Sequence, residues 1–212
     1  NIIFSFIKSK LTELKISAFN MKSKQGYLRN IIIREAQKSN QVLVNFITTN
    51  NKNSQLKKLS NALVKEFDFV KGVINTIVKP NSGSSIGDEE IILFGESYIE
   101  EMIGEYIFKI SKDSFFQTNS KQAEVLYEQI KLLSDLDGNE IVYDLYCGTG
   151  SIGIYLSKFV KKIYGIEVVM SAVLDGIENT NKNEIKNVNF FHGDLTNFFE
   201  ENKEIPFIEK PD

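Results

Sequence analysis

The segment from Ile141 to Gly153 constrains the fold of this chain more than any other. It reads Ile-Val-Tyr-Asp-Leu-Tyr-Cys-Gly-Thr-Gly-Ser-Ile-Gly, a short run of β-favouring residues followed by a glycine-rich turn and a helical pattern that starts at Ser151. Glycine lets a ligand approach the backbone closely, and the first turn of the following helix offers free N–H groups with a partial positive charge. The segment therefore predicts a strand, a tight loop and a helix that line a nucleotide-type pocket.

Strand and helix patterns alternate from this segment onward. In chain order they predict a strand over 141–145, a helix over 151–160, a strand over 162–167, a helix over 171–183 and a strand over 188–192. Such alternation is typical of a parallel sheet with right-handed crossovers. With a further helix expected over 120–134, we assign residues 113–212 to a Rossmann-like α/β domain.

The first half of the chain follows a different pattern. An amphipathic spacing predicts an N-terminal helix over residues 1–15, which we interpret as the end of an upstream domain. Residues 16–112 are expected to form a small central α+β domain on a largely antiparallel sheet. Its expected elements are strands over 27–34, 41–49, 70–78, 91–94, 98–103 and 106–110, and a helix from Ser54 to Phe67.

Composition narrows the class of protein. The 212 residues, 42% of them hydrophobic, suffice for one large domain or two modest ones with a real core. No apolar run approaches the roughly 18 residues of a membrane helix, and the N-terminal residues lack the basic region of a secretory signal. A single cysteine excludes an internal disulfide and favours a reducing compartment. We therefore expect a cytoplasmic protein without a membrane partner.

Charge is distributed unevenly along the chain. Residues 1–80 hold 14 Lys and Arg against 4 Asp and Glu, a net charge of +10, whereas residues 81–212 hold 11 against 24, a net charge of -13. Such asymmetry is a hint of nucleic-acid contact, although a solvated lysine-rich face gives the same count. Arg29 and Arg34 are the candidates for RNA contacts, because arginine binds phosphate in a bidentate manner.

The glycines also fit a second class of protein. Gly148, Gly150 and Gly153 match the G-x-G-x-x-G pattern of dinucleotide-binding domains, and Glu167 follows Gly148 by 19 residues. A nicotinamide-dependent oxidoreductase is therefore an alternative. Asp144 argues against it, because a carboxylate at the mouth of the loop opposes a pyrophosphate. The same carboxylate suits a ligand with an ammonium group and no phosphate, such as S-adenosylmethionine.

Two further acidic residues follow the next two predicted strands. Glu167 can accept hydrogen bonds from both hydroxyls of a ribose, and Asp194 is placed to accept one from an adenine amine. A single acid at a strand end is better explained as the cap of the next helix. Three such acids together with the glycines favour an S-adenosylmethionine site. The sequence offers no cluster with the spacing of metal ligands.

Three motifs resemble one enzyme family. They are Asp144-Leu-Tyr-Cys-Gly-Thr-Gly, Ser114-Phe-Phe-Gln-Thr-Asn-Ser-Lys-Gln-Ala-Glu124, and Gly26-Tyr-Leu-Arg-Asn30 together with Arg34. The chain resembles, over nearly its whole length, the class I S-adenosylmethionine-dependent methyltransferases that make 5-methyluridine in RNA, in the 23S ribosomal RNA branch. The resemblance implies that Gly26 to Arg34 lies near the substrate RNA. The cofactor contacts that it implies are Gln117, Tyr146, Glu167 and Asp194, with Ser151 as a fifth where relatives often carry Asn.

The resemblance also implies where the chemistry resides. The family uses a cysteine that adds to uracil C6, in a Ser-Cys-Asn context that follows an Asp-Pro-Pro-Arg-like motif, and both are expected after Asp212. Cys147 is expected to be a packing residue of the glycine loop. The chain is thus expected to be an internal fragment that lacks catalytic residues, binds the cofactor weakly and is inactive alone. Cysteines for an iron–sulfur cluster, which some relatives carry, are expected only upstream of Asn1.

We therefore predict a central α+β domain that is followed along the chain by the first half of a Rossmann-like class I methyltransferase domain. The complete protein is expected to be a monomer that methylates uridine C5 in RNA. The motifs favour 23S ribosomal RNA as the substrate, and tRNA is the alternative. A non-catalytic RNA-binding module is the other alternative to this function. With three parallel strands, the first strand of the sheet is expected to expose one edge.

Overall fold

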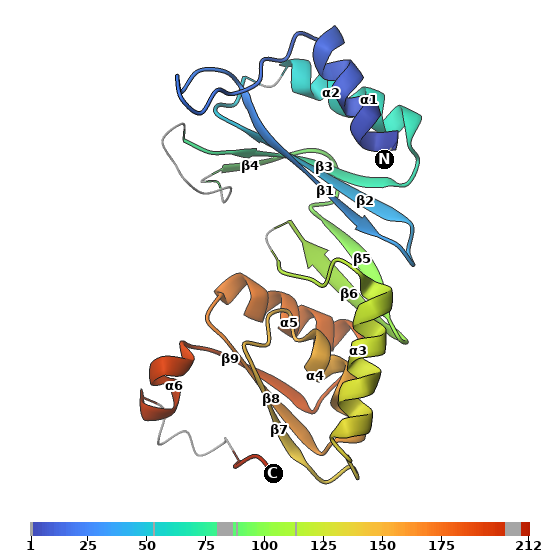
Figure 1. Ribbon diagram of the computed structural model, residues 1–212, viewed down its shortest axis with the longest axis vertical. Helices are drawn as coiled ribbons and strands as arrows, with labels where there is room; N and C mark the ends of the chain where they lie inside the picture. Colours follow the sequence, from blue (N-terminus) through green and yellow to red (C-terminus); the bar gives the residue numbers. More distant parts are fainter. Residues whose placement is uncertain (1, 53, 80–86, 88, 113, 202–208) are drawn as a thin grey trace. The chain divides into compact units, whose positions relative to one another are not determined.

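The computed structural model describes residues 2–52, 54–79, 87, 89–112, 114–201 and 209–212. These residues form two compact units, Asn1–Ile99 and Glu100–Asp212. In Figure 1 the first unit runs from blue to green and the second from green to red. No helix within the described ranges is both long and apolar enough to cross a membrane.

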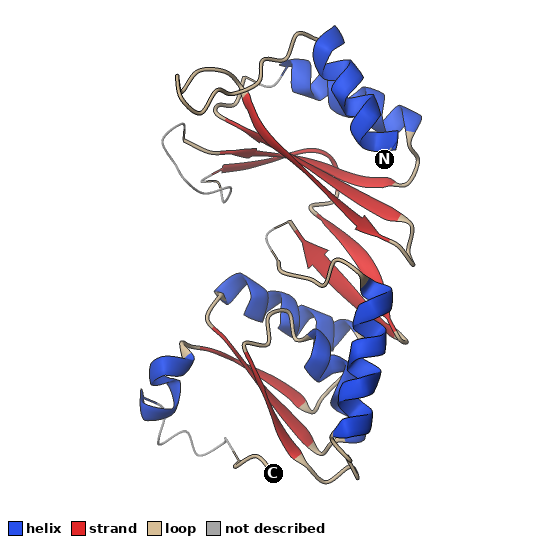
Figure 2. Ribbon diagram, viewed as in Figure 1, coloured by secondary structure: helices blue, strands red, loops and turns tan. Residues whose placement is uncertain are grey.

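The first unit is a four-stranded sheet with two helices on one face. Its elements are α1 (Ile2–Glu13), β1 (Leu28–Ala36), β2 (Gln41–Thr48), α2 (Ser54–Glu66), β3 (Val70–Ile77) and β4 (Glu89–Gly95). The strand order is β1-β2-β3-β4, and Figure 2 shows both helices on the same side of this sheet. The pairs β1–β2 and β3–β4 are antiparallel, as predicted, whereas β2 and β3 are parallel because α2 connects them.

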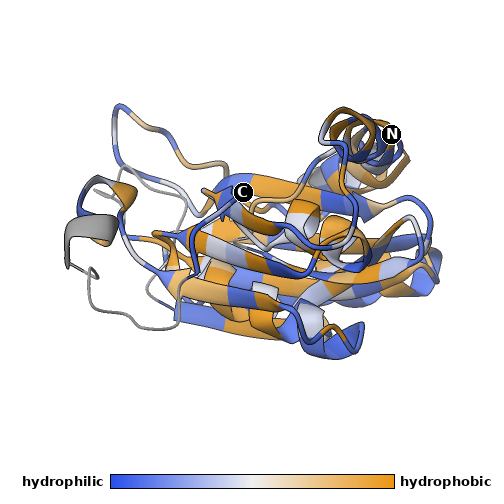
Figure 3. Ribbon diagram, turned by 90° about the horizontal axis from the view of Figure 1, so that it is seen from below, coloured by the Kyte–Doolittle hydropathy of each residue, from blue (hydrophilic) through white to orange (hydrophobic). Residues whose placement is uncertain are grey.

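The core of the first unit lies between the helices and the sheet. Leu56, Leu59 and Leu63 recur every three or four residues of α2, so they share one face of that helix and are fully buried. They pack against alternate residues of β2, including Val44 and Phe46. Figure 3, which views the molecule from below, colours stretches of both strands and helices orange, the colour of hydrophobic residues. The hydrophobic residues whose periodic spacing predicted these elements are therefore the residues that form the core.

The second unit carries the strand–helix alternation. Its elements are β5 (Tyr98–Ile103), β6 (Tyr106–Ser111), α3 (Ser120–Leu133), β7 (Ile141–Leu145), α4 (Ser151–Leu156), a 3-10 turn (Ser157–Phe159), β8 (Lys162–Glu167), α5 (Met170–Lys182), β9 (Val188–His192) and α6 (Leu195–Glu201). Strands β7, β8 and β9 form a parallel sheet in that order, and β5 pairs with β6 in a sheet of its own. The predicted Rossmann-like arrangement is confirmed.

Two asparagines fasten α5 to the backbone of β6. The Asn179 side chain accepts from the N–H of Lys109 at 2.7 Å and donates to its carbonyl at 3.4 Å. The Asn183 side chain does the same with Ile107, at 2.9 and 2.7 Å. The spacing matches because four residues of helix advance about 6 Å and two residues of strand about 6.6 Å. The hairpin β5–β6 is thereby bound to the second unit.

Because the hairpin is attached to the second unit, the boundary between the compact units differs from the predicted boundary between the domains. The sequence assigned β5 and β6 to a central domain over 16–112 and the helix over 1–15 to an upstream domain. In the structure the boundary between the two units lies within β5, after Ile99, and α1 packs against α2 inside the first unit. Polar pairing between a helix and a strand leaves no hydrophobic period in the sequence, so it could not be anticipated. The division into functional domains stays a prediction.

The first strand of the parallel sheet, β7, has the chain's last residues beside it. The N–H of Asp212 donates to the carbonyl of Ile141 at 3.1 Å, and the Asp212 carboxylate accepts from the N–H of Ile141 at 2.8 Å. Tyr143 donates its hydroxyl to the carbonyl of Glu209 at 2.8 Å. A cavity of about 550 Å³ borders the same strand and reaches Asp144. The strand edge predicted to be exposed is thus contacted near its start by residues 209–212.

Candidate functional site

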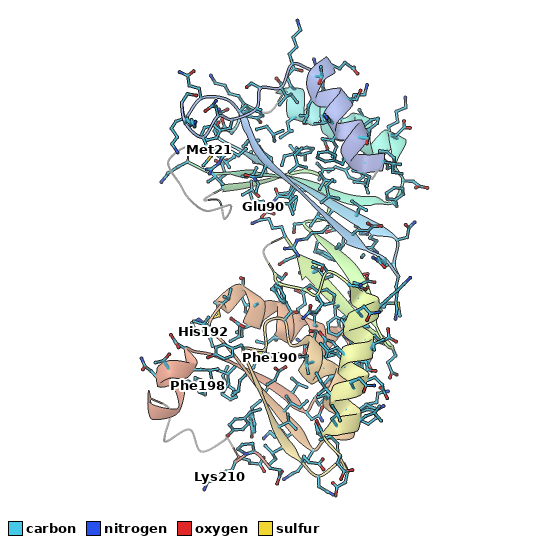
Figure 4. The ribbon with its side chains drawn as sticks, in the orientation of Figure 1. Met21, Glu90, Phe190, His192, Phe198 and Lys210 are labelled. Carbon is cyan, nitrogen blue, oxygen red and sulfur yellow. The ribbon has the colours of Figure 1, made fainter. Side chains whose placement is uncertain are left out.

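The candidate site lies where the parallel strands end. Because β7, β8 and β9 run in the same direction, their carboxyl ends meet at one edge of the sheet. Asp144 lies one residue before the end of β7, Glu167 is the last residue of β8, and Asp194 follows β9 by two residues. Figure 4 labels Phe190 and His192 on β9, just before Asp194. The fold therefore brings the three predicted acids to the same edge.

The glycine loop between β7 and α4 is a tight turn with three left-handed residues, Tyr146, Gly148 and Gly150, at φ of 60°, 55° and 73°. A Cβ on Gly150 would lie 2.3 Å from the Phe190 ring, so only glycine fits there. A Cβ on Gly148 would meet nothing within 4 Å. The space beside Gly148 is therefore open to a ligand.

Glu167 ties this loop to the one that follows β8. Its Oε2 accepts from the N–H of Gly148 at 3.0 Å and its Oε1 accepts from the N–H of Val169 at 2.8 Å. The side chain is almost fully buried. Each carboxylate oxygen has a second lone pair, so Glu167 can accept from a diol while it holds both loops.

Asp144 is a partly buried carboxylate beneath the first turn of α4. Its Oδ2 accepts from the N–H of Gly153 at 3.1 Å. Burial raises the pKa of Asp144 to about 6, and the hydrogen bond from Gly153 opposes this rise only in part. Since Asp144 forms no ion pair among the described residues, a cationic group of a ligand would stabilise its ionised form.

Asp194 is exposed and immediately precedes α6. Its side chain accepts from the N–H of Thr196 at 2.9 Å, and its backbone carbonyl accepts from the N–H of Phe198 at 2.8 Å. The hydrogen bond from Thr196 lowers the pKa of Asp194. The residue therefore has the geometry of a helix cap, which was the alternative explanation for strand-end acids. Its predicted contact with an adenine amine stays a prediction.

The remaining predicted cofactor contacts lie in three settings. Tyr146 is 74% exposed in the glycine loop. The Ser151 hydroxyl is 2.7 Å from the hydroxyl of Tyr127, a fully buried residue of α3 that sequence reasoning did not single out. Gln117 is exposed in the segment between β6 and α3. Tyr127 shows a helical apolar spacing, and only the structure reveals that its hydroxyl holds the start of α4.

The lone cysteine is a packing residue of the loop. Cys147 is buried, and a Cβ on Gly165 of β8 would lie 2.9 Å from its Sγ. Burial raises the pKa of the Cys147 thiol, and the carboxylates of Asp144 and Glu167 raise it further. A thiol that stays protonated at neutral pH is a poor nucleophile, in agreement with the predicted structural role.

The two predicted RNA-binding arginines lie in β1 and are half-buried. Arg29 donates to the carbonyl of Lys79 at 3.2 Å and its guanidinium lies 5.3 Å from the centre of the Phe19 ring. The contact with Lys79 joins Arg29 to the residues after β3, and the contact with Phe19 joins it to the loop that precedes β1. Lys22 and Lys24 are exposed in that loop and were not singled out from the sequence.

The only histidine of the sequence, His192, is the last residue of β9. Nε2 of His192 is 2.9 Å from the backbone carbonyl of Val168, so the ring forms a hydrogen bond with the loop that follows β8. Among the described residues, no group of three or more His, Cys, Asp or Glu side chains is arranged to hold a metal ion. With Asp144 and Glu167, the site is suited to a ligand that carries a cationic group and hydroxyl groups.

Comparison with known proteins connects this geometry to a family. The model of the tRNA (uracil-5-)-methyltransferase family matches residues 36–205. An uncharacterized RNA methyltransferase of Clostridium acetobutylicum is 38% identical over 193 residues, which cover 91% of this chain and 42% of that protein. A second one from the same organism is 41% identical over 184 residues, or 85% of this chain and 40% of that protein. The chain thus spans about two fifths of these relatives.

A solved structure extends the comparison to the fold. It is the tRNA (uracil-54, C5)-methyltransferase of Pyrococcus abyssi in complex with S-adenosyl-L-homocysteine, which is 29% identical, with a TM-score of 0.75, over 90% of this chain and 45% of that one. The likeness confirms the fold predicted for both parts of the chain, including its class I methyltransferase half. The chain belongs to the tRNA (uracil-5-)-methyltransferase family.

Proposed function

We propose that this chain forms the S-adenosylmethionine site and part of the RNA surface of an RNA uracil-C5 methyltransferase. The observation that carries the proposal is the pairing of Asp144 with Glu167 around one glycine loop. Asp144 offers a carboxylate without an ion-pair partner among the described residues, and Glu167 offers two oxygens beside the open space at Gly148. A ligand with an ammonium group and a ribose, and without phosphate, complements this arrangement.

Each residue has a proposed role toward that ligand. Asp144 accepts from the ammonium group, Glu167 from the ribose hydroxyls and Asp194 from the adenine amine. Gly148 and Gly150 allow the close approach. Tyr146, Ser151 and Gln117 complete the proposed contacts.

When bound, S-adenosylmethionine supplies an electrophilic methyl group. The residues of this chain bind and orient the cofactor. The glycine loop leaves room for the ligand beside Gly148, and Asp144 holds the amino-acid end of the ligand. Burial raises the pKa of the Cys147 thiol, which disfavours Cys147 as the nucleophile that adds to uracil C6. The proposal therefore assigns the nucleophile, and the base that removes the C5 proton, to another part of the longer protein, so the 212-residue chain is expected to be inactive alone.

The proposed substrate class is RNA. The motifs favour 23S ribosomal RNA, whereas the family description and the Pyrococcus abyssi relative both name tRNA. The test is methyl transfer by the full-length protein to purified 23S ribosomal RNA and to tRNA in parallel, with 5-methyluridine measured after digestion. Methylation of tRNA alone would replace ribosomal RNA as the substrate, and methylation of neither would contradict the proposal.

The dinucleotide alternative is tested on the chain itself. Isothermal titration with S-adenosylhomocysteine and, separately, with NADH compares a ligand that has an ammonium group with one that has a pyrophosphate. The proposal expects binding of the first and none of the second. Binding of NADH alone would establish the oxidoreductase alternative, and RNA binding without either small ligand would favour a non-catalytic RNA-binding module.

A further inference from the structure

The segment Ser114–Ser120 is held at its first residue by a buried carboxylate. Oδ2 of Asp175, on α5, accepts from the hydroxyl of Ser114 at 2.7 Å and from the hydroxyl of Ser111 at 2.8 Å. The Ser114 hydroxyl also accepts from the N–H of Ser111 at 2.9 Å. Ser114 is 2% exposed and Asp175 9%. The start of the segment is therefore fixed to α5.

A second buried carboxylate holds the other end. Oε2 of Glu101, on β5, accepts from the hydroxyl of Ser120 at 2.9 Å, and Oε1 accepts from the N–H of Met102 at 2.9 Å. Glu101 and Ser120 are each 2% exposed. Both ends of one short segment are thus closed by a carboxylate–serine pair, from two different elements of the second unit.

The residues between these two pairs are mostly exposed. Phe115 is 72% exposed, and Gln117, Thr118 and Asn119 are exposed as well. Phe116 alone turns inward, where its ring lies 5.6 Å from that of Phe108 on β6. The segment is therefore anchored at three points while it presents Phe115 and Gln117 to solvent.

Such an arrangement is unusual for a connection that only joins two elements. Burial of a carboxylate is unfavourable unless hydrogen bonds compensate. Two buried carboxylates around four exposed residues restrict the conformations of those residues. Restriction before binding lowers the entropic cost of binding a ligand.

We propose that Asp175 and Glu101 are positioning residues that hold Gln117 in its ligand-binding conformation. This inference rests on the proposed function, because it takes Gln117 as a cofactor contact. Neither carboxylate touches the ligand; each acts through a serine hydroxyl. Loss of either pair frees the segment, so S-adenosylhomocysteine binds about tenfold more weakly.

The test removes one hydroxyl at a time from the full chain. Ser114→Ala and Ser120→Ala each break one carboxylate–serine pair, and Ser114→Thr keeps the hydroxyl as the conservative variant. Asn183→Ala is the matched control: it removes two hydrogen bonds between the same helix α5 and the hairpin, at Ile107, away from the segment. The unfolding temperature of every variant is measured first, so that binding is compared only among folded proteins.

Two measurements test the positioning role of the carboxylates separately from the binding of the cofactor. The first is the rate of chymotrypsin cleavage after Phe115 without ligand, relative to cleavage after the exposed Tyr146, located by mass spectrometry. The second is the dissociation constant of S-adenosylhomocysteine from titration. Ser114→Ala and Ser120→Ala are expected to speed cleavage after Phe115 about tenfold and to weaken binding, whereas Asn183→Ala and Ser114→Thr change neither by more than about twofold.

The outcomes are distinguishable. Unchanged cleavage after Phe115 in both alanine variants would overturn the positioning role. Faster cleavage with unchanged affinity would keep the two carboxylate–serine pairs but overturn Gln117 as a contact of the ligand. No binding of S-adenosylhomocysteine to the unmodified chain would overturn the proposed function while the cleavage result still reports on the segment.

Discussion

At the scale of single residues, Asp144 links stability to ligand binding. The pKa of Asp144 rises from 3.8 to about 6 on folding, so between these values the folded chain holds a proton that the unfolded chain has lost. Stability therefore falls as pH rises from about 4 to about 6. Above pH 6 the ionised Asp144 costs about 3 kcal/mol of the free energy of unfolding.

The variant Asp144→Asn tests this trade-off. We expect it to raise the unfolding temperature at pH 7.5, because the amide keeps the hydrogen bond with Gly153 and carries no buried charge. The same variant loses binding of S-adenosylhomocysteine. The control is Asp194→Asn, at an exposed acid whose pKa is lowered, which removes no buried charge and gives no gain in stability. A drop in the unfolding temperature of Asp144→Asn would contradict this account of Asp144.

The same carboxyl predicts how binding depends on pH. A protonated Asp144 cannot pair with an ammonium group, so the dissociation constant of S-adenosylhomocysteine is expected to rise as pH falls below about 6, by up to tenfold per unit. Titrations at pH 5, 6, 7 and 8 measure it. An affinity that stays constant across this range would show that Asp144 does not hold the charged end of the ligand.

At the scale of elements, two positions of the glycine loop require glycine for different structural reasons. Both Gly148 and Gly150 are left-handed, but a Cβ on Gly150 collides with Phe190 of β9, while a Cβ on Gly148 points into open space. Gly150 serves the packing of the loop on the sheet. Gly148 serves the approach of a ligand.

The pair Gly148→Ala and Gly150→Ala separates these reasons. Gly150→Ala is expected to lose about 3 kcal/mol of stability, from the left-handed backbone and the contact with Phe190. Gly148→Ala loses about 1 to 2 kcal/mol from the backbone alone, yet weakens S-adenosylhomocysteine binding well beyond that loss in stability. Urea unfolding and titration measure both. Equal affinities for Gly148→Ala and the unmodified chain would place the ligand elsewhere.

The elements themselves were largely predictable from the sequence. Hydrophobic periods predicted β7, α4, β8, α5 and β9, because each buries one face against the others. They did not predict that Asn179 and Asn183 bind β6 to α5, or that Asp175 and Glu101 hold Ser114 and Ser120. Those contacts depend on polar side chains that meet only after the chain has folded, although Asp175 and Asn179 of α5 and Asn183, the C-cap of that helix, follow one another at intervals of four residues.

At the scale of the whole molecule, the positive charge of residues 1–80 is a candidate RNA surface. The loop before β1 carries Lys22 and Lys24 on its exposed tip, and no acidic residue occurs between Glu13 and Glu35. Arg29 is engaged with Phe19 and with Lys79, so its proposed RNA contact would add to a structural role. The exposed lysines are therefore expected to contribute more of the salt-dependent affinity.

Charge reversal tests that expectation. Lys22→Glu with Lys24→Glu is expected to weaken RNA binding by the full chain and to lower the salt slope by about two, one for each phosphate that a lysine no longer neutralises. The matched control is Lys57→Glu with Lys58→Glu, on the exposed face of α2, which changes the net charge equally. Equal reductions in affinity for both double variants would indicate attraction by net charge alone, without a surface at the loop.

Asp144, Glu167 and the glycine loop are proposed to form a site for S-adenosylmethionine, and a crystal structure of the chain with S-adenosylhomocysteine would test this proposal. We expect the amino group of the ligand within hydrogen-bond distance of Asp144, both ribose hydroxyls on Glu167, and the ligand against Gly148. A ligand bound away from these carboxylates, with Asp144 and Glu167 contacted only by the protein, would contradict it.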